Sequence, residues 1–416
     1  MNPRTIELEE FSTLAMSPAE VPGRVGVRVW ERYSEKIDVQ FPSPKTGGLL
    51  ELTPQGWAGH IPLDESYHLF IKPKVELEGL FRMLEYAYKL DFLAEGDLVG
   101  AASLQDFYER LARIVALRVL DRSRKGFYRE YAGRANRLPY VRGRVLLASM
   151  LRAPWDVALD CRYHENTADV EDNRILAWTL FCIARSGFCR EHVATVVRRA
   201  FRATQGIASP TPCPARLCRG RDYNRLNQDY QPLHALCRFF LDHAGPSHER
   251  GENRMLPFLI NMARLYEVFV AEWLRGRLPE SVLLRDQAPV RLGTESPVDL
   301  RVDLLLKDRR SGAPLCLLDT KYKTPVAPSA RDLEQVIAYA KATGCPHAVL
   351  VYPQKLRAPF DQVIGGDIRV WTATFGLSGD LDAQGDRFLA RLLRRIGRAE
   401  EGGHPEGREA LYVIDD

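Results

Sequence analysis

Short runs in which apolar and polar residues alternate lie in the first part of the chain and predict β-strands. The runs are GRVGVRVW at 23–30, KIDVQF at 36–41, GLLELTPQGWAGHIPL at 48–63 and YHLFIKPKV at 67–75. Alternation with a period of two is typical of a strand that is buried on one face, and Pro and Gly between the runs indicate turns. These residues predict a β-rich domain at 1–77, either a small barrel or a sandwich.

Apolar residues spaced three and four apart replace this alternation further along the chain and predict helices. The clearest runs are LEGLFRMLEYAYKL at 77–90, LQDFYERLARIVALRVLDRSRK at 104–125 and VEDNRILAWTLFCIAR at 170–185. Such spacing gives a helix one apolar face. We therefore expect a helical region at 78–250, which ends in the loop-like stretch HAGPSHERGEN.

The remaining pattern mixes both periods and predicts an α/β domain at 251–400, followed by a tail at 401–416. We expect one long helix at 255–278, strands near 282–292, 298–307 and 314–321, a helix at 331–343, and strands at 347–353 and 368–374. A mixed sheet flanked by helices accommodates this order. The chain as a whole is expected to be an α+β multidomain protein.

Composition narrows the class of protein. The 416 residues are 45% hydrophobic and 27% charged, as in soluble globular proteins. No apolar run approaches the roughly 18 residues that cross a bilayer, and the first ten residues do not resemble a signal peptide, so a cytoplasmic protein without membrane contact is expected. The eight cysteines lack paired zinc-ligand spacing, which favours reduced thiols.

Positive charge is concentrated between residues 110 and 144. This stretch holds eleven Arg or Lys and two acids, whereas the whole chain has a net charge of only +4. Such a field attracts phosphate backbones or an acidic protein surface, although a solvated helix face would have the same composition. The sequence does not choose between DNA and a protein partner for the candidate contact residues Arg134, Asn136, Arg137, Arg142 and Arg144.

Candidate chemistry lies on two expected strands, inside the first and at the end of the second. VDLRVDLLLKD contains Asp303, and LCLLDTKYK contains Asp319 and Lys321. Antiparallel pairing can bring Asp303 close to Asp319, and side chains alternate along a strand, so Asp319 and Lys321 share a face while Thr320 offers its backbone carbonyl. Two neighbouring carboxylates repel each other unless a cation lies between them, which predicts Mg²⁺, with Mn²⁺ possible.

Two further features strengthen this hypothesis against the simpler reading of a strand-end salt bridge. Glu267 lies on or beside the apolar face of the expected helix at 255–278, where an unpartnered carboxylate is costly. Gln335 and Tyr339 lie four residues apart on one face of the helix that follows the lysine. All of these side chains are therefore expected to meet at one site.

In this order, Glu267, Asp303, the Asp319-Thr320-Lys321 triplet and Gln335-x-x-x-Tyr339 resemble the PD-(D/E)xK nuclease superfamily. The resemblance implies phosphodiester hydrolysis, with Lys321 positioning the attacking water. One departure is that Val302, and not proline, precedes Asp303. Asp299 is a rival of Asp303 as a metal ligand, but Asp303 is preferred because an apolar strand follows it directly.

Five stretches along most of the chain resemble McrC, the nuclease subunit of McrBC modification-dependent restriction systems. They are HLFIKPKV leading into LFRMLEYAYKL, YVRGRV, NTADVEDNRILAW, RLYEVFV and LDTKYK. The resemblance implies that the C-terminal domain cuts double-stranded DNA. It also implies that the N-terminal part docks on an AAA+ GTPase of McrB type, which forms a hexameric ring. The sequence contains no G-x-x-x-x-G-K-[ST], so we expect this chain to bind no nucleotide through a P-loop.

Two functions from different classes follow. The first is a metal-dependent DNA endonuclease subunit that also stimulates its AAA+ partner. The alternative is a non-catalytic adaptor that has a nuclease-like fold and only activates the partner. Asp303, Asp319 and Lys321 are all present, and an adaptor has no physical need of all three, so the sequence favours the enzyme.

Overall fold

The computed structural model describes residues 4–64, 66–90, 103–146, 157–244, 257–292, 298–323 and 325–397. The chain forms two compact units. Unit 1 consists of Met1–Leu77 and Tyr88–Asn261, and unit 2 of Glu78–Ala87 and Met262–Asp416. The boundary expected at 250/251 and the tail expected at 401–416 lie outside the described residues. The mixed α and β composition predicted from the sequence is confirmed, with several sheets and several helices.

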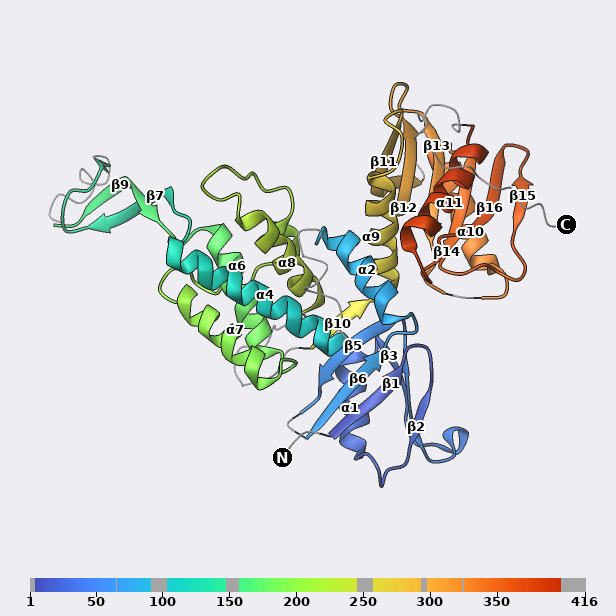
Figure 1. Ribbon diagram of the computed structural model, residues 1–416, viewed down its shortest axis with the longest axis horizontal. Coiled ribbons are helices and arrows are strands. Elements are labelled where there is room, and N and C mark those ends of the chain that lie inside the picture. The colour runs from blue at the N-terminus through green and yellow to red at the C-terminus, as the bar shows by residue number, and fades with distance from the viewer. Residues whose placement is uncertain are drawn as a thin grey trace. The chain divides into compact units, whose positions relative to one another are not determined.

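Two sheets begin unit 1 (Figure 1). The first has the order β1-β6-β5-β10 and consists of β1 (Arg4–Glu9), β5 (Trp57–Pro62), β6 (Tyr67–Lys72) and β10 (Phe258–Asn261). The second has the order β2-β4-β3 and consists of β2 (Leu14–Met16), β3 (Ile37–Gln40) and β4 (Leu50–Pro54), with the short 3₁₀ helix η1 (Pro44–Thr46) between the last two. One hydrophobic core contains side chains from both sheets.

The prediction of a strand at GRVGVRVW is wrong. This run forms the first part of helix α1 (Gly23–Tyr33). Val25, Val29 and Tyr33 are buried and recur every fourth residue, which is a helical spacing. Val27 completes the misleading alternation of valines but is 44% exposed. The buried valines of α1 join the core of the two sheets.

A pair of buried histidines lies across strands β5 and β6. His60 Nε2 and His68 Nδ1 are 3.0 Å apart and share a hydrogen bond. The His60 ring also stacks on Phe188, with centroids 4.7 Å apart. Burial lowers the pKa of His60 to about 3, and the neighbouring His68 adds to this effect. Burial also lowers the pKa of His68.

We expect unit 1 to lose stability as the pH falls below about 6.5, the usual pKa of an unfolded histidine. A depressed folded pKa means that the unfolded chain binds more protons between pH 6.5 and about 3, so the free energy of unfolding falls in that window. Urea unfolding at pH 7 and pH 5.5 should show a loss about 1 kcal/mol larger in wild type than in His60→Gln. Equal losses in the two proteins would contradict this.

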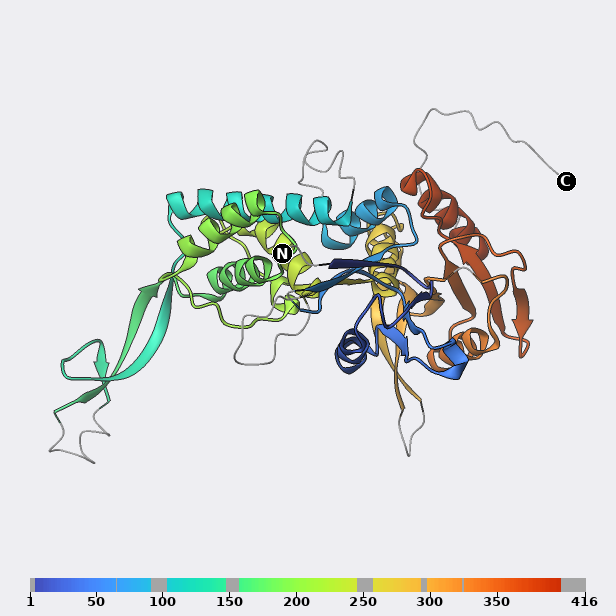
Figure 2. The same ribbon diagram turned by 90° about the horizontal axis from the view of Figure 1, so that it is seen from below.

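Within the described part of the chain, four more helices and a small sheet complete unit 1. The helices are α4 (Leu104–Lys125), α6 (Glu171–Arg185), α7 (Glu191–Thr204) and α8 (Tyr230–His243), with the short 3₁₀ helix η2 (Ala215–Cys218) before α8. The sheet has the order β7-β9-β8, from β7 (Glu130–Leu138), β8 (Arg144–Val145) and β9 (Leu159–Thr167). Strands β7 and β9, here called the β7–β9 ribbon, extend beyond the end of α4 in both views (Figures 1 and 2). The region expected to be helical therefore also contains strands.

Unit 2 is built on one six-stranded mixed sheet of order β11-β12-β13-β14-β16-β15. The strands are β11 (Val282–Leu292), β12 (Val298–Asp308), β13 (Pro314–Thr320), β14 (His347–Tyr352), β15 (Asp361–Ile364) and β16 (Ile368–Thr374). The first three pair antiparallel, β14 is parallel to both β13 and β16, and β15 is an antiparallel edge. The strands predicted from 282 onwards are confirmed.

The helices of unit 2 are α2 (Leu77–Tyr88), α9 (Met262–Arg275), α10 (Ala330–Thr343) and α11 (Leu381–Arg395). The single helix expected at 255–278 is wrong at its start, because Phe258–Asn261 pairs with β5 as strand β10. Helix α9 begins at the next residue, so no loop separates the strand of unit 1 from the helix of unit 2.

Asp382 joins three helices of unit 2. Its Oδ1 accepts hydrogen bonds from Tyr86 of α2, at 2.5 Å, and from Trp273 Nε1 of α9, at 2.9 Å. The Trp273 ring is 1% exposed and lies so close to Gly385 of α11 that a Cβ there would be 2.2 Å from Cζ2. These contacts hold α2, α9 and α11 together.

No described helix combines the length and the apolar character that crossing a membrane requires.

Candidate active site

The middle of β12 and the end of β13 bring Asp303 and Asp319 together. In the antiparallel pair β12–β13, Leu304 faces Leu318, and this register puts Asp303 opposite Asp319. Asp303 Oδ2 accepts hydrogen bonds from the Thr320 backbone N, at 2.9 Å, and from Thr320 Oγ1, at 3.0 Å. Thr320 therefore orients the Asp303 carboxylate, a role that the sequence analysis did not give to its side chain.

Asp319 is almost completely buried, with 2% of its surface exposed. Burial raises the pKa of its carboxyl to about 6; the Lys321 ammonium opposes this rise, and the charge of Asp303 adds to it. Lys321 Nζ forms an ion pair with Asp319 Oδ2 at 2.7 Å. A buried carboxyl with a raised pKa beside a specific charged partner is typical of functional sites.

A chain of polar contacts extends from Lys321 to helix α10. Lys321 Nζ donates to Gln335 Oε1 at 3.2 Å, and Gln335 Nε2 donates to the Tyr339 hydroxyl at 2.8 Å. The structure thus brings together the Asp319-Thr320-Lys321 triplet, which spans the end of β13, and the two residues of α10 that were expected to meet it. Their contacts fix the direction of the lysine side chain.

Glu267 of α9 reaches the same region. Its side chain is 12% exposed, and its Oε1 accepts a hydrogen bond from Gln287 Nε2 at 2.6 Å and forms an ion pair with Arg264. Burial raises the pKa of Glu267, and the charge of Asp303 acts in the same direction, whereas Arg264 and Gln287 oppose them. Glu267 therefore lies near enough to Asp303 for the two charges to interact.

Asp332 and Lys323 had no role in the site expected from the sequence. Asp332 Oδ2 forms an ion pair with Lys323 Nζ at 2.6 Å, and Asp332 Oδ1 lies 3.9 Å from Lys321 Nζ. Burial acts to raise the pKa of the Asp332 carboxyl. The hydrogen bonds from Lys323 and Ser329 lower it by more, so the pKa lies below its usual value. Ser329 and Asp332 form the capping box of α10, and S-x-x-D at 329–332 is a signal that the sequence carries.

The donor set of the site fits a divalent cation. No group of three or more His, Cys, Asp or Glu side chains is placed to hold a metal ion within the described ranges. Mg²⁺ does not require such a group, because it commonly takes one or two carboxylates and keeps several waters. Asp303 and Asp319 are two such carboxylates, and the charge of Asp303 makes ionisation of Asp319 harder, which a nearby cation would reverse. The side chain of Asp299, the rival ligand, lies outside the described part.

The five candidate contact residues lie on or beside the β7–β9 ribbon, far along the sequence from these acids. Arg134 and Arg142 both form ion pairs with Glu165, at 3.6 and 3.1 Å, and Asn136 Nδ2 donates to the Tyr163 hydroxyl at 3.0 Å. Arg137 follows on β7, and Arg144 begins β8. Exposed aromatic rings accompany them, with Tyr131 74% and Tyr140 57% exposed.

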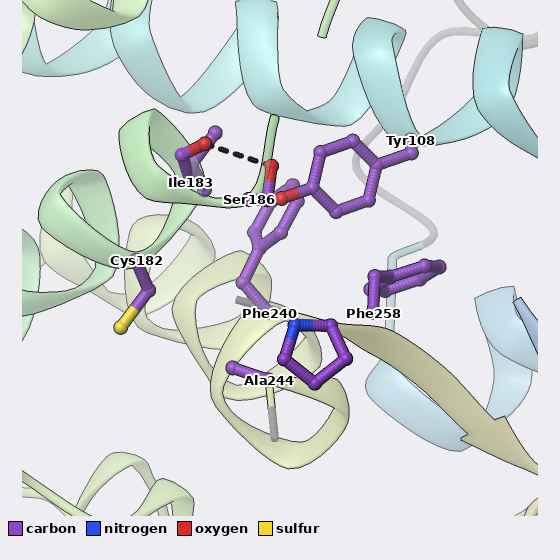
Figure 3. Close-up of a pocket in the computed structure, with 8 residues that line it drawn as sticks. Tyr108, Cys182, Ile183, Ser186, Phe240, Ala244 and Phe258 are labelled. Atoms are coloured by element: carbon purple, nitrogen blue, oxygen red, sulfur yellow. Dashed lines mark hydrogen bonds between the residues drawn. The ribbon is translucent and has the colours of Figure 1, made fainter. Parts of the chain in front are cut away.

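A small cavity in unit 1 offers no comparable chemistry (Figure 3). Its lining is mostly apolar and consists of Tyr108, Cys182, Ile183, Ser186, Phe240, Ala244, Pro257 and Phe258. Ser186 Oγ donates to the Ile183 carbonyl at 2.9 Å, as the dashed line shows. Burial raises the pKa of Cys182 to about 12 and that of Tyr108 further above its usual value, so neither group titrates near neutral pH.

Most of the chain is similar to known proteins of one family. A family described as McrBC 5-methylcytosine restriction system component matches residues 52–353. The type IV methyl-directed restriction enzyme EcoKMcrBC of Escherichia coli (strain K12) is 23% identical over 267 residues, which are 60% of this chain and 74% of that protein.

A solved structure has a similar fold. It is the refined half-complex from a tetradecameric assembly of Thermococcus gammatolerans McrB AAA+ hexamers with bound McrC, and one of its chains aligns with a TM-score of 0.55. That alignment covers 94% of this chain and 100% of the other at 16% identity. The family match covers well over half of the sequence, and the chain therefore belongs to the family of McrBC 5-methylcytosine restriction system components.

Proposed function

We propose that this chain is the nuclease subunit of a McrBC-type restriction system, a metal-dependent endonuclease that hydrolyses phosphodiester bonds in double-stranded DNA. The observation that carries the proposal is the convergence of Asp303, Asp319 and Lys321 where β12 and β13 pair. Two acids and an ammonium in a partly buried setting are the groups that this hydrolysis needs. In this proposal, unit 2 is the restriction-endonuclease-like domain expected from the sequence.

Asp303, Asp319 and the Thr320 carbonyl would hold Mg²⁺, for which Mn²⁺ can substitute. When bound, such a cation supplies positive charge to phosphate oxygens and lowers the pKa of a water. Thr320 holds the Asp303 carboxylate through two hydrogen bonds, so that this acid needs no rearrangement to act. Glu267 adds a third acid near Asp303.

Lys321 is suited to direct the attacking water. An ammonium has three N–H donors, and contacts with Asp319 Oδ2 and Gln335 Oε1 engage two of them. Asp332 Oδ1, at 3.9 Å, lies beyond hydrogen-bond distance. Among the described residues, one N–H of the ammonium is left to donate to the water or to an oxygen of the scissile phosphate, and Tyr339 keeps Gln335 in place for this.

We also propose that the chain acts with an AAA+ GTPase of McrB type. Membership of the McrBC family and the fold shared with a McrC bound to McrB hexamers support this partner. The ribbon residues Arg134, Asn136, Arg137, Arg142 and Arg144 carry a surface that suits either this partner or DNA.

The test is cleavage of methylated and unmethylated plasmid with Mg²⁺, the AAA+ partner and its nucleotide, comparing wild type with Lys321→Ala. The variant should cut about 100-fold or more slowly, because it loses the group that orients the water. It should still stimulate nucleotide hydrolysis by the partner as well as wild type does, because this reaction does not use the site.

Lys341→Ala is the matched control, since Lys341 is an exposed lysine in the last turn of α10. We expect this variant to cut as fast as wild type. A wild type that stimulates the partner but never cuts DNA would support the adaptor instead, and rapid cutting by Lys321→Ala would exclude the proposed role of the lysine.

A further inference from the structure

Gln287 has an unusual backbone conformation for a residue in a strand. Its φ is +49°, in the left-handed region, although it lies within β11 and is not glycine. The ladder pairs Asp286 with Leu304 and Ala288 with Val302, and the regular pairing is interrupted between them. Non-glycine residues keep such a conformation only where their surroundings enforce it, and these places cluster at functional sites.

The position of Gln287 connects two acids of the site. The flanking pairs put it opposite Asp303 on the neighbouring strand. Its Nε2 donates to Glu267 Oε1 at 2.6 Å. A single side chain therefore links helix α9 to the part of the sheet from which Asp303 projects.

This hydrogen bond decides where the Glu267 carboxylate lies. Arg264 precedes Glu267 by one helical turn and contacts the same Oε1 atom, so among the residues that the structure describes only this contact within its own helix would hold the carboxylate without Gln287. Gln287 is the contact among the described residues that ties it to the sheet. An amide is suited to this role because it donates a hydrogen bond without adding charge beside two acids.

We propose that Gln287 is a positioning residue, which holds the Glu267 carboxylate beside Asp303 so that its charge strengthens the hold of Asp303 and Asp319 on the cation. The inference rests on the proposed function. The left-handed backbone at residue 287 is the conformation from which its amide reaches Glu267, and the hydrogen bond to Glu267 in turn stabilises that backbone.

The substitution Gln287→Gly distinguishes a role in positioning Glu267 from a role in stabilising the fold. Glycine adopts a positive φ without strain, so the melting temperature should stay the same or rise. The affinity for Mn²⁺, measured by calorimetry on the full chain, should fall about 10- to 100-fold, as it does when partners of metal-site acids are removed. DNA cleavage in the complete complex should fall by a similar factor.

Gln362→Gly is the matched control, because Gln362 is an exposed glutamine of the edge strand β15. Glycine at this position should lower the melting temperature slightly and leave Mn²⁺ affinity unchanged. The opposite responses of the two Gln→Gly variants would not arise from a general effect of glycine in a strand.

A double-variant cycle tests whether Gln287 acts through Glu267. If it does, Glu267→Ala with Gln287→Gly should bind Mn²⁺ no more weakly than Glu267→Ala alone. Additive losses, an unchanged affinity in Gln287→Gly, or no Mn²⁺ binding by wild type would overturn the inference. A wild type that binds Mn²⁺ but does not cut would remove the proposed function, and the affinities would still decide the role of Gln287.

Discussion

Replacing Asp319 by asparagine is expected to slow DNA cleavage about 100- to 10,000-fold while the chain stays folded. Asparagine has the shape of aspartate but no charge, so it can neither hold a divalent cation as a carboxylate does nor pair with the Lys321 ammonium. Cleavage of methylated plasmid should be followed under single-turnover conditions with the AAA+ partner, Mg²⁺ and nucleotide. Nucleotide hydrolysis by the partner is measured in the same reactions.

The same variant should be at least as stable as wild type at pH 7.5 in the absence of metal. The pKa of folded Asp319 is raised to about 6, above its unfolded value of 3.8, because the side chain is buried. Its contribution to stability is thus fully present below pH 3.8 and is lost as the pH rises through 6. Thermal melts from pH 4 to 7.5 should show this loss in wild type and not in Asp319→Asn. Full cleavage by the variant would contradict the proposed role of the acid.

Trp273→Ala should lower the free energy of unfolding of unit 2 by about 3–5 kcal/mol. The tryptophan is 1% exposed, packs on Phe375 with ring centroids 5.1 Å apart, and donates to Asp382, so its loss leaves a cavity and an unsatisfied acceptor. Denaturant unfolding followed by circular dichroism would measure the change.

Trp30→Ala is the comparison, because Trp30 is 53% exposed on α1. Its removal should cost less than about 1 kcal/mol, as surface substitutions usually do. Losses of similar size in the two variants would show that Trp273 does not anchor the packing of α9 and α11.

The candidate site was largely predictable because its residues lie in or next to strands and a helix whose apolar and polar residues follow a clear pattern. Asp303 and Asp319 adjoin apolar strand segments joined by the short turn KDRRSGAP, so antiparallel pairing of the two strands was predictable, although the register shift between Leu306 and Lys307 was not. The four-residue spacing of Gln335 and Tyr339 likewise defines one face of a helix, and these side chains hydrogen-bond directly. Their catalytic roles remain predictions.

Other features depend on contacts between distant parts of the chain, which no local pattern reveals. Phe258–Asn261 continues a helical pattern but forms a strand, because β5 is there to pair with it. Gln287 has a positive φ and contacts Glu267, twenty residues away. Glycine or asparagine would have indicated a positive φ, whereas glutamine gives no such signal.

The division of the chain between the two units also sets the order in which they form during synthesis. Helix α2 belongs to unit 2, yet residues 88–261, which belong to unit 1, follow it in the chain. At about 5–20 residues per second, Tyr86 waits roughly 9–35 s before α9, which carries its partner Phe269, is made, and longer for Asp382. The three acids of the site also come after residue 261. A growing chain therefore contains all of unit 1 before it contains any of these acids, and a product that stops before residue 267 lacks all three of them.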